Sequence, residues 1–336
     1  MRKWLLAAPK PQQNRMMTAA YGAVAVAGDA EWTSIGESFL AESAGLRLLD
    51  LGPLAHVTSV GNWFLAGCPQ LTALDLAPLA HVTSVSSSFL FDCAALTALD
   101  LSPLAHVTCV GNCFLALCAQ LTALDLAPLA RVTSVGNSFL YDCSALTVLN
   151  LSALAQVTSV SSFLAGCSGL TALDLAPLAH LTCAGSSFLY DCAGLTVLDL
   201  SPLAHVSVGD GFLAACAGLT VVDLSSLAHV GSVGGSFLYD CVHLTALDLA
   251  PLACVTSVGD CFLSGCSGLT ALDLAPLANV NSVGDCFLSD CCGLTALDLS
   301  PLSHLSIVGD SFLVGCSALC VLRLDPRFTM LSEAED

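Results

Sequence analysis

A repeat of 25 residues constrains this chain more than any other feature of its sequence. The dipeptide Phe-Leu recurs along the 336 residues at intervals of 25, with two intervals of 24. The repeating skeleton is F-L-x-x-C-x-x-L-x-x-L-x-L-x-P-L-x-x-V-x-x-V-G-x-x. A unit this short cannot bury so many apolar side chains by itself, whereas stacked units can bury them against their neighbours. The repeat therefore predicts a solenoid.

The pattern inside one repeat predicts its local structure. The segment from Leu71 to Leu76 ends in strict alternation of apolar and polar residues, which is typical of a strand. Pro78 should close that strand, because proline cannot donate to a central ladder. The glycine after the second Val is expected at a bend with positive φ; it occurs, for example, at Gly61, Gly111, Gly136 and Gly259. The Phe-Leu-x-x-Cys segment is expected to form short helical or 3-10 turns.

The spacing of Leu-x-x-Leu-x-Leu resembles that of leucine-rich repeat proteins. The half-repeat Val-x-x-Val-Gly-x-x-Phe-x-x-x-Cys resembles the BspA-like, Treponema-type class, and the likeness covers Phe39 to Leu324. The resemblance implies an α/β repeat solenoid, the leucine-rich repeat horseshoe. A parallel β-sheet would line one face, with short helical or 3-10 turns and loops on the other.

The predicted domain organisation is a single solenoid with two short extensions. Residues 1–15 form a disordered leader, 16–328 the solenoid, and 329–336 an acidic tail. Apolar residues from Tyr21 to Ile35 fall on repeat positions, which predicts a degenerate N-terminal capping repeat. Ala25-Val26-Ala27 also fits a signal-peptidase site, so a signal peptide is the alternative. No transmembrane span is predicted, because the most apolar stretch keeps the repeat pattern.

Charge and the placement of polar residues exclude several functions. The chain carries 27 Asp+Glu against 8 Lys+Arg, a formal net charge of −19. It has no basic stripe to bind nucleic acid or an anionic membrane surface. Its polar residues repeat, whereas a catalytic site needs different groups converging at one place. We therefore expect no enzyme activity and no cofactor.

Eleven of the 19 cysteines occupy one repeat position beside Phe and Leu, which indicates buried core residues. They are Cys68, Cys93, Cys118, Cys143, Cys167, Cys192, Cys216, Cys241, Cys266, Cys291 and Cys316. The odd total and the repeat spacing argue against a disulfide framework, and the lack of a CxxC motif argues against zinc. Cysteines off this row, including Cys113, Cys261 and Cys286, are expected to be partly exposed. So many free thiols favour an intracellular location, with the cell surface or secretion as the alternative.

An aspartate projects from most of the predicted strands on the side away from the core. The candidate binding residues are Asp75, Asp100, Asp125, Asp174, Asp199, Asp223, Asp248, Asp273 and Asp298, and Asp50 shares their position. Mutual repulsion should raise their pKa values and attract cations. The row would bind a basic partner segment or, less favourably, Ca²⁺. Alternatively, it only keeps the solenoid soluble.

Two further rows recur at fixed repeat positions. In alternate repeats an aromatic residue directly precedes an Asp, at Phe91, Tyr141, Tyr190 and Tyr239. These aromatic side chains either interlock with smaller residues of the neighbouring repeats or contact a partner. A row of histidines shares a position with Arg131, Gln156, Cys254 and Asn279, which indicates an exposed row rather than a metal site.

The sequence therefore predicts a non-enzymatic protein-interaction module that binds a basic partner on its Asp-lined sheet face. The resemblance to BspA-like proteins implies a variant of this function, surface attachment to host or matrix proteins. A structural, self-associating repeat protein is the alternative, and cation binding by the aspartates is a weaker one. The partner's identity and the oligomeric state stay open.

Overall fold

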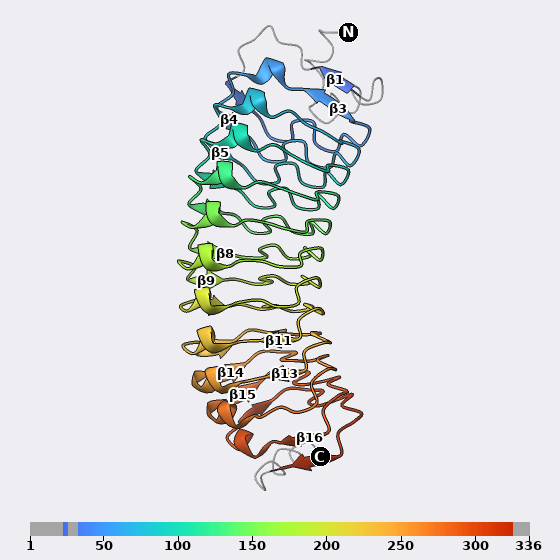
Figure 1. The fold of residues 1–336 in the computed structure, drawn as a ribbon, viewed down its shortest axis with the longest axis vertical. Helices are drawn as coiled ribbons and strands as arrows, with labels where there is room; N and C mark the ends of the chain where they lie inside the picture. Colours follow the sequence, from blue (N-terminus) through green and yellow to red (C-terminus); the bar gives the residue numbers. More distant parts are fainter. Residues whose placement is uncertain (1–22, 26–32, 325–336) are drawn as a thin grey trace. The chain divides into compact units, whose positions relative to one another are not determined.

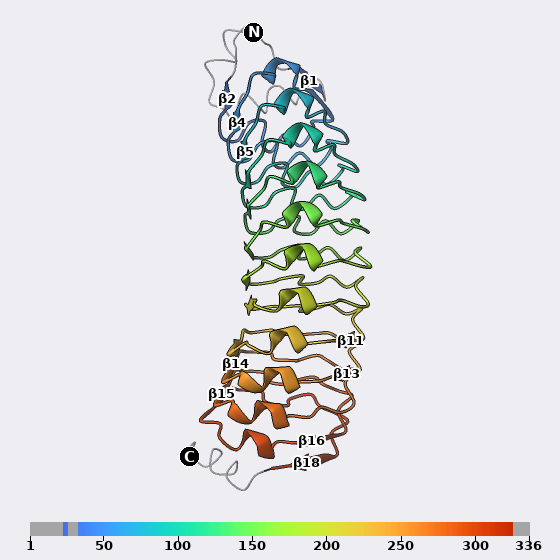
Figure 2. The same ribbon diagram turned by 60° about the vertical axis from the view of Figure 1, so that its left-hand side comes forward.

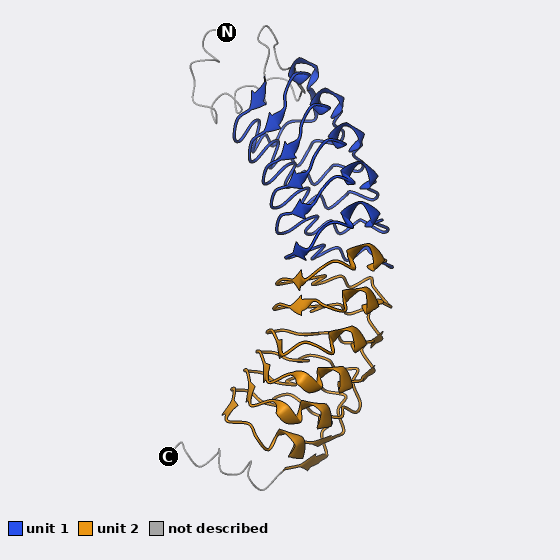
Figure 3. Cartoon of the chain, turned by 90° about the vertical axis from the view of Figure 1, so that its left-hand side faces the viewer, with its two compact units in different colours: residues 1–173 blue, residues 174–336 orange. Residues whose placement is uncertain are grey.

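The computed structural model describes residues 23–25 and 33–324. The chain divides into two compact units, residues 1–173 and 174–336, coloured separately in Figure 3. Each unit is a stack of similar coils, and one sequence repeat makes one coil (Figure 1). The predicted repeat solenoid of short parallel strands and 3-10 turns is thereby confirmed.

The elements of the first unit alternate short strands with 3-10 helices. They are β1 (Ala23–Ala25), β2 (Ser34–Ile35), β3 (Leu48–Asp50), η1 (Gly52–Leu54), β4 (Ser59–Val60), η2 (Ala77–Leu79), β5 (Ser84–Val85), η3 (Ser102–Leu104), β6 (Cys109–Val110), η4 (Ala127–Leu129), β7 (Ser134–Val135), η5 (Ser152–Leu154) and β8 (Ser159–Val160).

The second unit repeats this order. Its elements are η6 (Ala176–Leu178), β9 (Cys183–Ala184), η7 (Ser201–Leu203), β10 (Ser207–Val208), β11 (Val221–Val222), η8 (Ser225–Leu227), β12 (Ser232–Val233), β13 (Ala246–Leu247), η9 (Ala250–Cys254), β14 (Ser257–Val258), η10 (Ala275–Asn279), β15 (Ser282–Val283), β16 (Ala296–Asp298), η11 (Ser300–Leu302), β17 (Ile307–Val308) and β18 (Val321–Arg323).

The most continuous ladders run through the Ser-Val segment of each repeat. In the first unit β2, β4, β5, β6 and β7 form one parallel sheet, and Ser59–Val60 pairs with Ser84–Val85. In the second unit β12, β14, β15 and β17 form another. The 3-10 helices of successive coils lie above one another within each unit (Figure 2). The valine of these strands points into the core, as at the buried Val60 and Val85, except at the end of the second unit, where Val308 is half-buried.

The placement of the strands differs in part from the sequence prediction. Among the described residues, the Leu-x-Leu segment pairs only as β1–β3, β11–β13 and β16–β18, with one isolated bridge between Ala123 and Val148. Its extended stretch is short because a 3-10 helix begins directly after it. The N–H of Ala77 donates to Asp75 Oδ1 at 2.8 Å, which turns the chain within two residues.

The 3-10 helices were expected around Phe-Leu-x-x-Cys, and this expectation was wrong. They lie instead at the Ala-Pro-Leu segment, where Pro78 occupies the first turn and Leu79 is buried. Proline suits this place because its fixed φ is helical and its missing N–H would have no helical acceptor.

The Phe-Leu-x-x-Cys segment instead alternates between left- and right-handed backbone. In one coil Trp63, Leu65 and Gly67 have φ of 62°, 53° and 69°. Their N–H groups donate to carbonyls of neighbouring coils: Trp63 to Ser87, Leu65 to Phe39, and Gly67 to Phe91. These bonds between coils compensate for a conformation that L-residues otherwise avoid.

The glycine after the second Val serves close packing rather than a positive φ, so the sequence expectation for it was wrong. At Gly136, a Cβ atom would lie 2.4 Å from the backbone N of Asn112 and 2.5 Å from the carbonyl carbon of Gly111. A side chain at Gly136 would therefore meet the backbone of the preceding coil. Ser86 and Ser161 occupy the same repeat position in two other coils, so glycine is not required there in every coil.

The core of each coil is filled by the same repeat positions. In the coil that starts at Phe64, the side chains of Phe64, Leu71 and Val82 are fully buried. The phenylalanines stack from Phe39 to Phe163 with ring centroids 5.2–5.8 Å apart. A second stack runs from Phe188 to Phe312 at 5.1–5.9 Å. The spacing of Phe-Leu in the sequence therefore sets which residues of successive coils pack against one another.

At the N-terminal end, β1 pairs with β3 so that Val24 lies opposite Leu49. This offset of 25 residues is the one that a capping repeat predicts. The predicted leader (1–15), the tail (329–336) and most of the proposed signal segment lie outside the described residues. Among the residues described, no helix combines the length and apolar character needed to cross a bilayer.

Candidate functional site

The predicted aspartates form an exposed row in each unit, and each carboxylate has a structural task. Asp Oδ1 accepts the backbone N–H two residues later at 2.8–2.9 Å, which caps the 3-10 helix that follows. This bond is made by Asp75, Asp100, Asp125, Asp174, Asp199, Asp223, Asp248, Asp273 and Asp298, and also by Asp50. Asn150, which replaces one Asp of the row, makes the same bond at 2.9 Å.

Hydrogen bonds to the carboxylate also lower the pKa of Asp100, Asp199 and Asp298; at Asp298 the hydroxyl and backbone N–H of Ser300 are the leading causes. The hydroxyl and backbone N–H of Ser102 hold the pKa of Asp100 below its usual value. At Asp199, the backbone N–H and then the hydroxyl of Ser201 lower the pKa in the same way. The expectation that mutual repulsion raises the pKa values was wrong for these residues, because hydrogen bonds to the ionised form dominate.

One member of the row is already engaged by a basic side chain. Arg323 occupies the Asp position of β18, directly opposite Asp298 of β16. Its Nη1 lies 3.3 Å from Asp298 Oδ2, while Oδ1 of the same carboxylate accepts the N–H of Ser300 at 2.9 Å. Both side chains remain accessible, 75% for Arg323 and 44% for Asp298. One carboxylate can therefore cap its own helix and still bind a guanidinium.

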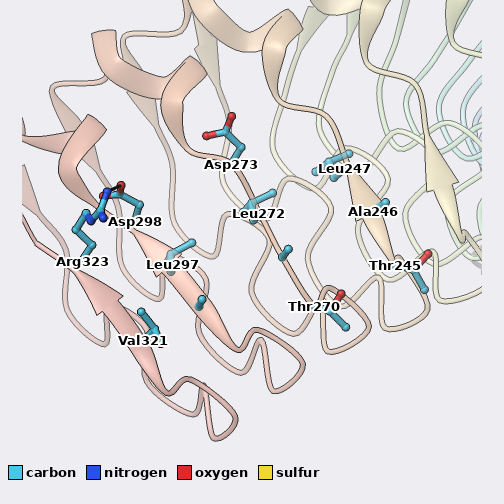
Figure 4. A pocket seen from close by; sticks show the side chains of 12 residues that line it. Thr245, Ala246, Leu247, Thr270, Leu272, Asp273, Leu297, Asp298, Val321 and Arg323 are labelled. Atoms are coloured by element: carbon cyan, nitrogen blue, oxygen red, sulfur yellow. Dashed lines mark hydrogen bonds and ion pairs between the residues drawn. The ribbon is translucent and has the colours of Figure 1, made fainter.

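The same end of the second unit carries an open depression of about 680 Å³ (Figure 4). Its wall comes from three strand segments and the 270–273 stretch between them, including Thr245, Thr270, Asp273 and Val321. Figure 4 shows Asp298 and Arg323 side by side at one end of it. The depression is shallow and open, which suits an extended chain better than an enclosed small molecule.

A row of apolar side chains that the sequence analysis missed runs beside the aspartates. It lies two positions before each Asp, or before the Asn150 or Arg323 that replaces it, and most repeats carry Ala there. Larger residues are Leu48, Val148, Val197, Val221 and Val321, with exposures of 59%, 71%, 71%, 57% and 60%. The Thr-Val-Leu segments at 147–149 and 196–198 are visible in the sequence, but no exposed apolar row was predicted from them. We call the surface formed by the Thr, Ala or Val, and Asp positions the Asp face.

The aromatic row lies on a different part of each coil. Tyr141, Tyr190 and Tyr239 are 36–39% exposed, and Phe91 is half-buried against Trp63 with centroids 6.0 Å apart. The Asp that follows each aromatic has a left-handed backbone, for example φ 54° at Asp142. In the intervening coils this place is taken by Gly in some repeats, as at Gly166 with φ 78°, but by Leu117 and Ala215 in others, with φ 63° and 57°. Gly and Asp tolerate this conformation best, whereas Leu and Ala adopt it at a cost in strain.

The buried cysteines form a ladder of hydrogen-bonded thiols. None of the 19 cysteines, all of which lie in the described part of the chain, is in a disulfide; ten of the eleven in the predicted row are buried, and Cys316 is partly exposed. Each thiol for which the bond is described donates to a leucine carbonyl, such as Cys143 to Leu115 at 3.2 Å. Burial raises the pKa of the Cys68 thiol to about 11. These thiols are inert core residues, as the repeat spacing predicted.

The histidines of the predicted row are exposed, and His205 stacks on His229 with centroids 6.2 Å apart. Within the described part of the chain, no three His, Cys, Asp or Glu residues are grouped so that they could hold a metal ion. The cation-binding alternative therefore gains no support from that part of the structure.

The fold and the repeated surface rows define a leucine-rich repeat solenoid. The model for the BspA-type leucine-rich repeat region matches residues 33–171 and 231–334. Because this match covers most of the chain, the chain belongs to the BspA-type leucine-rich repeat family, as the sequence resemblance indicated. No curated protein sequence matches it significantly.

Solved structures of bacterial leucine-rich repeat proteins share this fold. A leucine-rich repeat protein from Bacteroides ovatus has a TM-score of 0.63 at 18% identity, over 91% of this chain and 81% of its own. A leucine-rich cell surface protein from Faecalibacterium prausnitzii has a TM-score of 0.57 at 14% identity, over 92% and 90%. The match to the functional domain of InlJ from Listeria monocytogenes, at 21% identity and a TM-score of 0.48, covers 87% of this chain but 55% of that chain.

Proposed function

We propose that the chain is a non-enzymatic protein-interaction module that binds a basic, extended segment of a partner protein on its Asp face. Membership of a family whose repeats typically serve binding rather than catalysis supports the general class of function. The open depression and the exposed Val positions support the choice of face, because they offer apolar contact beside the carboxylates.

The contact between Arg323 and Asp298 is the observation that carries the proposal. It is an intramolecular example of a basic side chain bound at this face, at 3.3 Å from Oδ2. Because Oδ1 stays on the backbone N–H of Ser300, binding does not require the cap to open. The same cap is made by Asp223, Asp248 and Asp273 through Oδ1, which leaves Oδ2 of each outside the cap and able to accept from a partner's Arg or Lys.

The spacing of the row suggests the conformation of the partner. Parallel strands lie about 4.8 Å apart, so every second Asp recurs at roughly 9.6 Å. A polyproline II chain rises about 3.1 Å per residue and presents every third side chain at roughly 9.3 Å. A segment with Arg at every third position would therefore stay in register over several repeats.

The test uses the peptide (Arg-Pro-Pro)₄ as a defined probe, measured by fluorescence anisotropy at low and moderate salt. The variant Asp223→Asn/Asp248→Asn/Asp273→Asn removes three charges from the face, and Asn150 shows that Asn preserves the cap. We expect this variant to bind roughly tenfold more weakly, because up to two attractive pairs and the general negative potential of three carboxylates are lost.

A second triple provides the matched control. Asp210→Asn/Asp260→Asn/Asp285→Asn removes the same charge from another row of the same unit. Those carboxylates also accept backbone N–H groups, and Asn112 makes the equivalent bond to Asn137 at 2.8 Å. The control should bind nearly as well as the native chain. Equal weakening by both triples would refute the Asp face as the binding site.

A further inference from the structure

Two partly exposed cysteines occupy the same place in consecutive coils of the second unit. Cys261 directly precedes Phe262 and Cys286 directly precedes Phe287, and these two rings stack at 5.5 Å. The two cysteines have nearly equal φ, 56° and 57°. Each N–H donates to the carbonyl one coil further on, Cys261 to Asp285 and Cys286 to Asp310, both at 2.7 Å. Their side chains therefore leave the backbone in the same direction, one above the other.

The separation of the two cysteines suits a disulfide. The preceding strands β14 and β15 pair in register, with Val258 opposite Val283. Parallel strands lie about 4.8 Å apart, and disulfide-linked Cα atoms lie about 4.4–6.8 Å apart. Burial raises the pKa of the Cys261 thiol, and the charge of Cys286 and a hydrogen bond with it add to that shift. The two sulfurs are thus close enough to interact.

The buried cysteine ladder lacks this accessibility although its members have the same spacing. The thiols of Cys266 and Cys291 lie in the core and donate to the carbonyls of Leu238 and Leu263, both at 3.1 Å. A reagent would have to open the coil to reach them. Cys261 and Cys286 are partly exposed and can be attacked from solvent.

We propose that Cys261 and Cys286 form a redox-active dithiol that closes to an intramolecular disulfide by exchange with a small disulfide. One cysteine, as thiolate, attacks the reagent's S–S bond and forms a mixed disulfide, and one reagent thiol leaves. The second cysteine then attacks the mixed disulfide and releases the second reagent thiol. The two protein sulfurs are oxidised, the two reagent sulfurs are reduced, and both thiol protons pass to the released thiols.

The surrounding charge selects the kind of reagent. Asp260 and Asp285 directly precede the two cysteines, and both carboxylates raise the pKa of the Cys261 thiol, behind burial and Cys286. The same charges repel an anionic disulfide and attract a cationic one. Cystamine, which carries two amines, should therefore react faster than glutathione disulfide at this pair, by roughly threefold or more.

Cys113 provides a natural control in the first unit. It occupies the same repeat position and is also partly exposed with φ 56°, but Ser88 and Ser138 stand in the adjoining coils. Asn112 and Asn137 take the place of the flanking aspartates. Cys113 should therefore stop at the mixed disulfide and show less preference for the cationic reagent.

The experiment treats the native full-length chain with cystamine, quenches with acid, blocks remaining thiols with N-ethylmaleimide, and maps peptides by mass spectrometry. We expect a linked peptide pair containing Cys261 and Cys286, reversed by dithiothreitol, and a cysteamine adduct on Cys113. The proposal is overturned if Cys261 and Cys286 each carry a separate adduct, or if both stay unmodified while Cys113 reacts.

Two variants separate the geometry from the charge. Ser138→Cys places a second thiol one coil from Cys113, and it should convert the adduct there into a linkage. Failure of that linkage would refute the argument from coil register. Asp260→Asn/Asp285→Asn should reduce the ratio of cystamine to glutathione disulfide rates toward that of Cys113. An unchanged ratio would refute the charge selection.

Discussion

The stacked phenylalanines are the main support of each coil, so truncating one in the middle of a stack should be severe. Phe114 is fully buried and lies between Phe89 and Phe139, with centroids 5.7 and 5.6 Å away. Replacing a buried Phe by Ala costs about 3–5 kcal/mol through lost transfer energy and the cavity that remains. Two ring contacts, each worth about 0.5–1.5 kcal/mol, are lost with it. We therefore expect Phe114→Ala to lower the free energy of unfolding by about 4–5 kcal/mol, near the upper end of that range.

The end of the stack provides the comparison. Phe39 is partly exposed and has one described ring neighbour, Phe64 at 5.7 Å. Phe39→Ala should therefore cost about half as much, roughly 2 kcal/mol, because less area and one fewer contact are lost.

Urea unfolding followed by circular dichroism measures both losses, and hydrogen exchange locates them. Because coils contact only their neighbours, amides between residues 89 and 139 should lose protection first in Phe114→Ala. A cost for Phe114→Ala below about 1.5 kcal/mol, or one no larger than that of Phe39→Ala, would refute the stacking argument.

Three further predictions concern thiols and backbone. Burial raises the pKa of Cys68 to about 11 and of Cys118 to about 12. The stability that these protonated thiols contribute to the fold is fully present below the unfolded thiol pKa of about 8.5. It is lost as the pH rises through their pKa values in the folded state. Urea midpoints measured from pH 8 to 10.5 should therefore fall, and Cys68→Ala should lessen that fall. Gly136→Ala should destabilise the first unit by about 1–3 kcal/mol or more in the same assay, because its Cβ would meet backbone; a neutral result would contradict the close approach seen at that glycine. Ala215 has a φ of 57°, so Ala215→Gly should raise the free energy of unfolding by about 0.5–1 kcal/mol, whereas Ala214→Gly should lower it. Equal losses for the two variants would exclude strain at Ala215.

The repeat register could be predicted from the sequence because identical residues at identical offsets can only stack. The Phe-Leu spacing placed Phe64 over Phe89, and the structure has them 5.2 Å apart. The same logic identified the buried cysteines and the exposed row of aspartates. These features depend on period and polarity, which the sequence states directly.

The local conformation could not be predicted equally well. The alternation from Leu74 to Leu76 fits a strand, but the Oδ1 of Asp75 turns the chain before a long ladder forms. Similarly, Gly136 was expected to have positive φ, but its φ is not positive and the backbone of a neighbouring coil approaches it closely instead. In both cases a contact made only in the folded stack decides between conformations that the repeat pattern allows equally.

The binding role proposed for the Asp face falls on residues that also cap the 3-10 helices, so a test must remove the charge without removing the cap. Substitution of an Asp by Ala or Ser would remove the cap together with the charge. Substitution by Asn keeps the acceptor that Asn150 provides naturally. Loss of binding can then be separated from loss of folding.

The most direct measurement of the central claim is affinity capture by three versions of the chain, followed by quantitative mass spectrometry. The three are the native chain, Asp223→Asn/Asp248→Asn/Asp273→Asn, and the control Asp210→Asn/Asp260→Asn/Asp285→Asn. We predict partners with basic segments that are captured by the native chain and the control, are lost from the Asp-face variant, and weaken with salt. Recovery of the same partners by all three chains would contradict the claim that the Asp face binds them.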